Sequence, residues 1–486
     1  MANKSEQTLQ HWSQQQRNAE AMVPIIGELY REHGVIVTVF GNSLVNQSPL
    51  EILEIHRLAR VNVDDDIWVS DTYPILAAMA ELDLGPARID IGNLVSHWRG
   101  RAGEMSVGDF VRDELAGVAT GKASIRPNPQ DVVLYGFGRI GRLVARILAG
   151  KTGGGDNLRL RAIVVRPAGG DDLAKRASLL RRDSIHGPFS GEVQIDPEDN
   201  ALIINGNVVH VIHANGPEEV DYTKYGIRDA IVVDNTGKWR TREELSKHVA
   251  APGASKVILT APAKGDVPNI VYGVNHHGMV EAGNVLSAAS CTTNAIAPVL
   301  KVVNDEFGID SGHVESIHAF TNDQNLIDNY HRKARRGRAA PLNMVVTETG
   351  AVKAVAKCLP ELAGRLTGNA IRVPTPNVSL AVMSLNLAKE TTKQELNDYL
   401  RKVSLEGDLQ NQIDFTNSPE VVSSDFVGNR FAGIVDAQAT LVQGNHCVLY
   451  VWYDNEFGYS RQVVRCLEEL AGIVMPNFPK RAVRAT

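Results

Sequence analysis

Cysteine is scarce in this sequence, and its four copies stand far apart. No pair of them forms a CxxC pattern, so the sequence suggests neither a zinc site nor a disulfide framework, and we predict no metal site. Scattered single cysteines are typical of a protein from a reducing compartment. The four positions are Cys291, Cys358, Cys447 and Cys466.

Long apolar runs and excess positive charge are also missing. No apolar segment is long enough to cross a bilayer, and the polar start, MANKSEQTLQHWSQQQ, lacks the apolar core of a secretory signal. The net charge is −6, so no global basic field is available for nucleic acid or an anionic membrane. We therefore expect a cytoplasmic protein with no nucleic-acid or membrane partner.

The first part of the chain, residues 1–128, is predicted to be a mainly helical extension that ends in a linker. Apolar residues between Met22 and Leu29 recur at helical spacing, and Ser48, followed by a proline, is typical of a helix N-cap. The stretch GKASIRPNPQ, at 121–130, mixes glycine, serine and proline as linkers do. No catalytic constellation is visible before this linker.

From residue 131 onward, strands alternate with helices. The strand DVVLYGFG runs into a glycine turn, the amphipathic helix RIGRLVARILAG follows, and LRLRAIVVR is a second strand. This order predicts a parallel sheet. Gly136, Gly138 and Gly141 spell G-x-G-x-x-G, which allows a tight turn, close approach of the backbone to a pyrophosphate, and close packing of helix on strand. We predict dinucleotide binding; a tight turn without a ligand is the alternative.

An acidic residue is missing where a Rossmann unit that prefers NAD usually carries one, at the end of the second strand. Here that strand ends AIVVRPAGG, with Val164 and Val165 in the corresponding region and Arg166 directly after them. An arginine at this place suits the 2′-phosphate of NADP. Alternatively, Arg166 points into solvent and other groups hold the ribose, and both interpretations stay open.

The stretch SAASCTTNAIAP, at 287–298, places Cys291 among small and hydroxylated residues at the start of a helical pattern. A helix N-terminus directed at the sulfur favours thiolate over thiol. His318 lies on the next predicted strand, which can return it to the thiol, and a Cys–His pair lowers the thiol pKa and supplies a general base. The alternatives are a space-filling cysteine and an ordinary histidine at a strand end.

Seven motifs follow one another in a single order: GFGRIGR, SCTTN, HAFTNDQ, TGAVKAV, RVPTPNVS, VVSSDFVG and WYDNEFGYS. Together they resemble the phosphorylating glyceraldehyde-3-phosphate dehydrogenase family over about residues 131–470. The resemblance implies an α/β Rossmann dinucleotide-binding domain at 129–290, onto which a C-terminal helix at 456–473 packs. It implies an α+β catalytic domain at 291–455 and a homotetramer. The mainly helical N-terminal extension lies outside it.

The chemistry that the resemblance implies is the oxidation of glyceraldehyde 3-phosphate through a cysteine thioester, with hydride transfer to NAD or NADP. Cys291 resembles the nucleophile and His318 the base, and inorganic phosphate then releases an acyl phosphate. The backbone amide of Cys291, at the helix start, is expected to help hold the developing oxyanion. The covalent route splits one difficult step into two easier ones.

Further site residues are carried over from the family by motif. The positions that resemble the substrate-phosphate site are Thr321, Asp323 and Arg372. Those that resemble the inorganic-phosphate site are Ser290, Thr292, Arg336, Thr349 and Gly350. The expected cofactor-binding positions are Gly136, Gly138, Arg139, Ile140, Gly141, Arg166, Thr236, Gly237, Thr260 and, for the nicotinamide carboxamide, Asn455.

The sequence also departs from the family pattern. Asn329 and Tyr330 stand where NAD-preferring members often carry Leu-Pro, which adds to the missing acid in putting strict NAD preference in doubt. The segment IDNYH is similar to erythrose-4-phosphate dehydrogenase, the closest alternative, whereas Thr349 and Gly350 favour a phosphate-using enzyme.

A further alternative is a regulatory or binding protein on a dehydrogenase fold. The basic run HRKARRGR, at 331–338, can be read as a nucleic-acid patch, but in the family it maps to the loop that lines a neighbouring subunit's cofactor site. No motif in the N-terminal region indicates a particular ligand. It is expected to bind a second copy or an unknown partner, or to cap the active site.

Overall fold

The computed structural model forms two compact units. Unit 1 comprises Met1–Asn128, Gly153–Asn157 and Ile473–Thr486, and unit 2 comprises Pro129–Thr152 and Leu158–Gly472. Most of the predicted linker at 121–130 lies outside the described residues. The structure describes residues 2–63, 66–118, 126, 128–151, 157–167, 169–406, 408–473 and 475–479.

Unit 1 is rich in helix, as predicted, and has its own buried core. Met22, Ile26 and Leu29 face this core, and Ser48 caps a helix by accepting from the amide of Glu51 at 3.3 Å. A small sheet, in the order β2-β1-β3-β22, was not predicted. Its elements are α1 (Ala2–His33), β1 (Ile36–Val39), β2 (Asn42–Ser43), α2 (Pro49–Val63), α3 (Val69–Ala80), β3 (Arg88–Asp90), α4 (Ile91–Arg99), α5 (Val107–Glu114) and β22 (Asn477–Phe478).

The first half of unit 2 is built on the predicted parallel sheet, in the order β13-β12-β11-β4-β5-β10-β9-β8. The strands from β13 to β10 run parallel, and β9 and β8 are antiparallel additions. The elements are β4 (Gln130–Tyr135), α6 (Arg139–Lys151), β5 (Leu158–Val165), α7 (Asp172–Arg181), β8 (Val193–Asp196), β9 (Ala201–Ile204), β10 (Asn207–His213), β11 (Ala230–Asp234), α8 (Arg242–Ala250), β12 (Ala254–Leu259) and β13 (Val285–Ser287).

This strand order contains a topological switch point. From β4 the chain moves outward through β5 and β10, and it then returns to β11 on the other side of β4. In open α/β sheets, ligands bind outside the carboxyl ends of the strands at such a point. The glycine turn after β4 lies there, which confirms the predicted Rossmann architecture.

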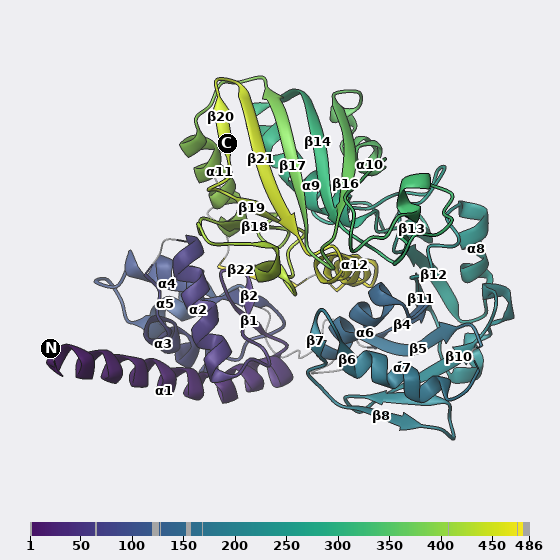
Figure 1. Cartoon of the computed structure of the whole chain (residues 1–486). Coiled ribbons are helices and arrows are strands. Elements are labelled where there is room, and N and C mark those ends of the chain that lie inside the picture. The colour runs from purple at the N-terminus through teal and green to yellow at the C-terminus, as the bar shows by residue number, and fades with distance from the viewer. Residues whose placement is uncertain are drawn as a thin grey trace. The chain divides into compact units, whose positions relative to one another are not determined.

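The second half of unit 2 is a mixed sheet in the order β15-β16-β14-β17-β21-β19-β18, with β20 paired to β21. Figure 1 shows α9, α10 and α11 on one side of it. The elements are α9 (Cys291–Phe307), β14 (Ile309–Ala319), β15 (Val345–Thr347), α10 (Ala351–Cys358), β16 (Leu366–Val373), β17 (Ser379–Leu387), α11 (Lys393–Glu406), β18 (Ile413–Thr416), β19 (Gly433–Asp436), β20 (Leu441–Gln443) and β21 (His446–Tyr453).

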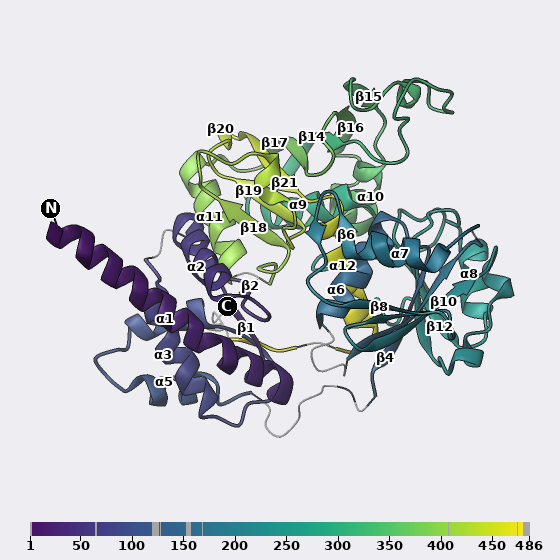
Figure 2. The ribbon, with the colours of Figure 1, turned by 60° about the horizontal axis from the view of Figure 1, so that its bottom comes forward.

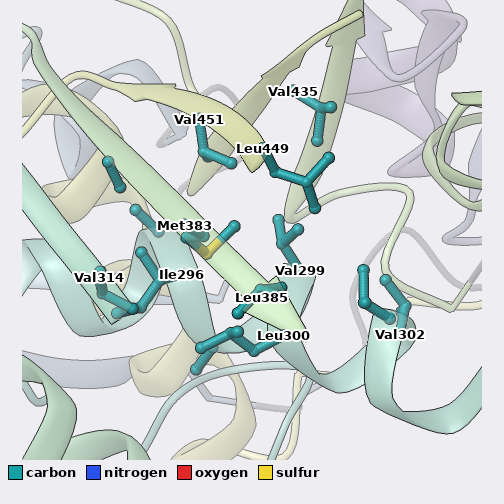
Figure 3. Close-up of a cluster of buried hydrophobic side chains, with 14 of the residues drawn as sticks. Ile296, Val299, Leu300, Val302, Val314, Met383, Leu385, Val435, Leu449 and Val451 are labelled. Carbon is teal, nitrogen blue, oxygen red and sulfur yellow. The ribbon is translucent and has the colours of Figure 1, made fainter. Parts of the chain in front are cut away.

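Helix α9 is fixed by the core of this second half. Figure 3 shows Ile296 and Leu300 of the helix gathered with Met383 and Leu385 of β17 and Val451 of β21, all of them buried. Burial of each such side chain contributes about 1.5–3 kcal/mol, so the position of the helix start is well determined. The catalytic α+β fold that the sequence predicted is therefore confirmed.

The last helix of unit 2, α12 (Phe457–Leu470), returns to the dinucleotide-binding half. It packs against α6 and also contacts α9, and Figures 1 and 2 both show α12 beside α6. The two halves of unit 2 are therefore joined through this helix and the turn before it. Among the residues that the structure describes, no helix combines the length and the hydropathy needed to cross a bilayer.

Candidate active site

The start of α9 presents Cys291 to His318. Ala289 adopts a left-handed φ of 54°, and Ser290 caps the helix by accepting from the amide of Thr293 at 3.0 Å. Cys291 is the first helical residue, and its Sγ lies 3.5 Å from His318 Nε2. The structure thus brings together the two residues that the sequence singled out, at a distance that permits proton transfer.

Burial governs the charge of this pair. It raises the pKa of the Cys291 thiol, although Arg372 and the neighbouring Thr292 act in the opposite direction. Burial and Arg372 lower the pKa of His318 to about 3. Donors at the helix start do favour the thiolate, as predicted, but desolvation outweighs them and the cation in this structure. Both partners are neutral at neutral pH.

Arg372 is held beside His318 by strand pairing. It lies on β16, directly opposite His318 on β14. Its Nη1 is 2.9 Å from His318 Nδ1 and 3.1 Å from the carbonyl of Ala319, whereas its Nε has no hydrogen-bond partner among the described residues. A largely buried guanidinium with an unused donor beside the thiol is suited to an anion.

The remaining predicted anion-binding residues are distributed over the loops that follow β14 and β15. Arg336 pairs with Asp323 and donates to Thr347 Oγ1 at 3.2 Å, so one contact joins residues expected in two different phosphate sites. Burial raises the pKa of Asp323, but the contact with Arg336 acts in the opposite direction, and the pKa is lowered overall. Thr321, before Asp323, is partly exposed. Farther along, Thr349 Oγ1 accepts from the amide of Ala351 at 3.2 Å and Gly350 is the N-cap of α10.

Tyr453 is a residue of the site that the sequence did not single out, although it stands within WYDNEFGYS. Its hydroxyl lies 2.9 Å from Thr292 Oγ1 and 2.9 Å from Ser316 Oγ, and its ring is 6.0 Å from the His318 ring. Thr292 is buried, and its hydroxyl is occupied by this contact. Tyr453 therefore packs beside His318 and ties α9 to the sheet.

The glycine turn has the geometry that the pattern predicts. Gly136 has φ +96°, and a Cβ on Gly141 would lie 2.4 Å from the carbonyl oxygen of Gly136, while a Cβ on Gly138 would meet nothing within 4 Å. Two of the glycines are thus needed by the fold, and Gly138 leaves open the space through which a pyrophosphate approaches. Arg139 and Ile140 begin α6, and the first amides of a helix have no acceptor within the helix and can bind an anion.

Asp234 arranges the other expected cofactor residues, and the sequence did not single it out. Its Oδ1 accepts from both the amide and the hydroxyl of Thr236 at 2.7 Å. Its carbonyl accepts from the amide of Thr260 at 2.9 Å, and Gly237 follows with φ +63°. One buried residue at the end of β11 therefore places Thr236 and Thr260 at the carboxyl edge of the sheet, and Gly237 follows Thr236 in the chain.

Asn455 and Arg166 are the two remaining residues expected to bind the cofactor. Asn455 is buried and its Oδ1 accepts from Ser379 Oγ at 2.9 Å, and Ser379 Oγ in turn accepts from the amide of Ala319 at 3.0 Å. Asn455 is thus joined to the residue after His318. Arg166 is exposed directly after β5, a position that leaves both of its predicted interpretations open.

The other chemistry-bearing side chains have simple surroundings. Cys358, Cys447 and Cys466 are buried and free, as expected for core residues. Within the described part of the chain, no group of three or more His, Cys, Asp or Glu side chains is arranged to hold a metal ion.

Comparison with known proteins gives similarity along both halves of unit 2. Residues 130–242 match the family described as "Glyceraldehyde 3-phosphate dehydrogenase, NAD binding domain", and residues 290–455 match its "C-terminal domain". A curated "Glyceraldehyde-3-phosphate dehydrogenase-like protein" from Pseudomonas aeruginosa (strain UCBPP-PA14) is 58% identical over 461 residues, which is 94% of this chain and 100% of the relative. That match is longer than unit 2, so it includes part of unit 1.

Shorter relatives match over a smaller share of the chain. "Glyceraldehyde-3-phosphate dehydrogenase 2" of Nostoc sp. is 41% identical over 342 residues, which is 70% of this chain and 98% of the relative. "Glyceraldehyde-3-phosphate dehydrogenase 1" of Bacillus subtilis is 42% identical over 335 residues, which is 68% of this chain and 96% of the relative.

Proposed function

Because this chain belongs to the glyceraldehyde-3-phosphate dehydrogenase family, an NAD(P)-binding oxidoreductase family, we propose that it oxidises glyceraldehyde 3-phosphate to an acyl phosphate. The reaction consumes inorganic phosphate and reduces NAD or NADP. The observation that carries the proposal is the 3.5 Å contact between Cys291 and His318, with Arg372 beside them.

The neutral pair suggests the first chemical step. Cys291 Sγ attacks the aldehyde carbon while its proton passes to His318 Nε2, and His318 then gives this proton to the oxyanion, which yields a thiohemiacetal and a neutral His318. A preformed thiolate is not required, because the base stands within reach of the thiol. The backbone amide of Cys291, at the start of α9, is placed to stabilise the oxyanion.

The substrate carbon is then oxidised while it is bound to the Cys291 sulfur, and the acyl group is released from the same sulfur. His318 takes the proton of the thiohemiacetal hydroxyl as the carbon loses hydride, which leaves a thioester; a bound nicotinamide supplies the hydride acceptor. An oxygen of inorganic phosphate attacks the thioester carbon, and Cys291 leaves as thiolate and regains a proton. Arg372, with its unused Nε, is the group that we propose for holding a phosphate beside the sulfur.

The roles of the other site residues are proposals of the same kind. We propose that Thr321 and Asp323 join Arg372 on the substrate phosphate, and that the inorganic phosphate is held by Ser290, Thr292, Arg336, Thr349 and Gly350, with the Thr292 hydroxyl exchanging its contact to Tyr453 for the anion. The pyrophosphate is placed on the glycine turn and the start of α6, with Thr236, Gly237 and Thr260 around the cofactor and Asn455 on the carboxamide.

The proposed reaction is tested by assaying the purified full chain with glyceraldehyde 3-phosphate and either cofactor, with and without inorganic phosphate. We expect phosphate-dependent reduction of the cofactor, and Cys291→Ser should lower turnover by about 10³-fold or more. His318→Asn should lower it by about 10²–10⁴-fold. Cys447→Ala removes a thiol outside the pair and is the matched control. Turnover by Cys291→Ser at the wild-type rate would overturn the proposal.

Erythrose 4-phosphate is the alternative substrate, since IDNYH is similar to that enzyme class. Assaying both aldehydes in parallel separates the two activities, and a phosphate-independent oxidation of erythrose 4-phosphate would favour the alternative. A regulatory protein would turn over neither aldehyde, and its biological role would survive Cys291→Ala.

We also propose that the enzyme accepts NADP as well as NAD. The support is the exposed Arg166 after β5 and the absence of an acid in the segment AIVVR that closes this strand. Arg166→Ala should raise the KM for NADP and leave that for NAD within about twofold. A strong preference for NAD in the intact protein would contradict this assignment.

A homotetramer is the proposed assembly. Apolar side chains that are more than two-thirds exposed gather on the loops around β15, namely Leu326, Ile327, Tyr330, Leu342 and Met344. Exposed apolar surface of this density marks an interaction site, which fits the family assembly. Sedimentation velocity tests the proposal, and a monomer at micromolar concentration would refute it.

We propose a cytoplasmic location, supported by the four free cysteines in the described part of the chain, and cell fractionation tests it.

We also propose that unit 1 binds a second copy or a further protein. Co-purification with a version of the chain that carries a different tag would detect self-association.

A further inference from the structure

Asn455 lies in the turn between β21 and α12, and both of its neighbours in the chain are carboxylates. The side chain of Asp454 is fully buried and that of Glu456 is 14% exposed. Two buried acids beside a proposed cofactor residue need partners, because an unpaired buried charge costs several kcal/mol. Their partners come from the dinucleotide-binding half of unit 2.

Glu456 is paired with the residue that follows the glycine turn. Arg139 Nε donates to Glu456 Oε1 at 3.0 Å, and its Nη2 donates to Oε2. The third donor, Nη1, reaches Asp183, which lies on the short strand β6 (Arg182–Asp183). A two-point arginine–carboxylate contact fixes geometry as well as charge. The side chain of Arg139 therefore ties the glycine turn to the residue after Asn455, a role that the sequence did not predict.

Asp454 is paired with His186. Its Oδ2 accepts from His186 Nε2 at 3.1 Å and from the amide of Gly428 at 2.8 Å. Its Oδ1 accepts from the amides of Glu456 and Phe457 at 2.9 and 2.8 Å, so this carboxylate shapes the turn that carries Asn455. His186 Nδ1 lies 3.5 Å from Asp183 Oδ1, and its side chain is 4% exposed.

Two of the acids in this cluster stay ionised in spite of their burial. Burial acts against ionisation of the acids, yet the backbone amides of His186 and Ile185, together with Arg139, hold the pKa of Asp183 at about 2. In the same way, His186 holds the pKa of Asp454 below its ordinary value. Asp183 and Asp454 are thus charged at neutral pH.

We propose that His186, Asp454 and Glu456 are positioning residues for hydride transfer. With Arg139 and Asp183 they form a clamp of ion pairs and hydrogen bonds that holds Asn455, and with it the nicotinamide ring, at a fixed place relative to the glycine turn and the thiol. The inference rests on the proposed function, from which the role of Asn455 comes. It adds that the carboxamide residue is set by charges that stand on both sides of it.

The test uses Glu456→Gln and His186→Asn in the full-length protein. Glu456→Gln keeps the size of the side chain and weakens the contact to Arg139, and His186→Asn replaces the imidazole with a smaller polar group and weakens its contacts to Asp454 and Asp183. We expect kcat to fall about 10- to 100-fold, because displacement by as little as about 1 Å costs that much, while the KM for cofactor changes less than about threefold. With aldehyde deuterated at the reacting carbon, the isotope effect on kcat should increase, since hydride transfer becomes slower than product release.

Two further readouts separate positioning from folding. Alkylation of Cys291 by iodoacetamide and the midpoint of urea unfolding should remain close to the wild-type values in both variants. Glu420→Gln, which neutralises an exposed carboxylate outside the clamp, is the matched control and should leave every readout unchanged. Loss of kcat in parallel with thiol reactivity and stability would overturn the proposal, as would wild-type kcat and isotope effect in both variants.

The fluorescence of bound reduced cofactor tests the clamp without turnover. Nicotinamide emission depends on how the ring is held, so its intensity should change in Glu456→Gln and stay constant in Glu420→Gln. If the wild-type protein turns over no aldehyde, the proposed function fails, and this signal still decides the inference. Unchanged emission in both clamp variants would refute it.

Discussion

At the scale of single residues, the thiol of Cys291 is subject to opposing effects. The helix start and the Arg372 guanidinium stabilise the thiolate, whereas removal of the sulfur from water favours the neutral form. In this structure burial is the largest of these effects, and the imidazole is too weak a base to hold a proton near pH 7. His318 is therefore available as a neutral base from the first step.

This balance predicts the pH dependence of alkylation. The thiol pKa lies above the ordinary 9.0 and that of His318 is about 3, so the rate of alkylation by iodoacetamide should rise continuously through about pH 9. Arg372→Met removes a cation that stabilises the thiolate, and it should slow alkylation about two- to tenfold at a fixed pH. Stopped-flow or mass-spectrometric rates measure both effects. A plateau between about pH 5 and 7 would reveal a thiolate–imidazolium pair and contradict the prediction.

At the scale of secondary-structure elements, the glycines of the glycine turn have different roles: one is required by the packing of the fold, and another leaves room for a ligand. The space beside Gly141 is filled by the backbone of Gly136, whereas the space beside Gly138 is open. The same residue type thus serves packing at one position and access at the other.

A pair of variants tests this division. Gly141→Ala should lower the free energy of unfolding by about 1–3 kcal/mol, because backbone must move to accept the added Cβ. Gly138→Ala should leave stability within about 0.5 kcal/mol and weaken cofactor binding, because its Cβ projects into the approach to the pyrophosphate. Urea unfolding and cofactor titration measure the two effects. Equal loss of stability in both variants would show that a Cβ at Gly138 meets other atoms of the folded protein, and would contradict the prediction.

The packing of α2 on α3 in unit 1 contains a buried histidine with a predictable pH response. His56 is fully buried, with Nδ1 2.8 Å from the carbonyl of Ile52 and Nε2 2.9 Å from Thr72 Oγ1. Burial is the main cause that lowers its pKa from 6.5 to about 4. Protons therefore bind the unfolded chain more readily below pH 6.5, and stability falls as the pH drops toward 4.

The expected size of this effect is about 3 kcal/mol, which is lost between pH 6.5 and 4. In His56→Gln, which cannot titrate, unit 1 should lose less stability over that range, although it starts from a lower value at pH 7. Denaturation followed by proteolysis of unit 1 at each pH measures the difference. His33→Gln, which changes a partly exposed histidine of the same unit, is the control, and an identical acid response in wild type and His56→Gln would refute the assignment.

At the scale of the whole molecule, short-range patterns predicted more than long-range ones. The glycine turn and the start of α9 at Cys291 depend on local motifs that could be predicted from the sequence, and the Cys–His pairing followed from the expected return of the next strand. Arg139 and Glu456 are 317 positions apart, and β22 pairs with β3 from the opposite end of the chain. No periodicity within either segment encodes such a partner. The neutrality of Cys291 also escaped prediction, because burial is a property of the folded chain.

The return of the chain to unit 1 implies that this unit depends on both ends of the sequence. Phe478 is 2% exposed within the core of unit 1, β22 runs parallel to β3, and the amide of Arg88 donates to the carbonyl of Pro476 at 2.9 Å. The C-terminal strand therefore supplies both backbone pairing and a core side chain to the N-terminal unit.

Loss of that side chain should weaken unit 1 selectively. Phe478→Ala creates a cavity that costs about 3–5 kcal/mol, whereas Phe478→Leu keeps most of the volume and should cost less than about 1.5 kcal/mol. Calorimetry combined with limited proteolysis reports the two units separately: in Phe478→Ala, cleavage should begin between residues 1 and 128, while unit 2, which contains the whole proposed catalytic site, keeps its transition temperature and its turnover. Cleavage that begins in unit 2, or a single transition that moves as one, would mean that the two units do not unfold independently.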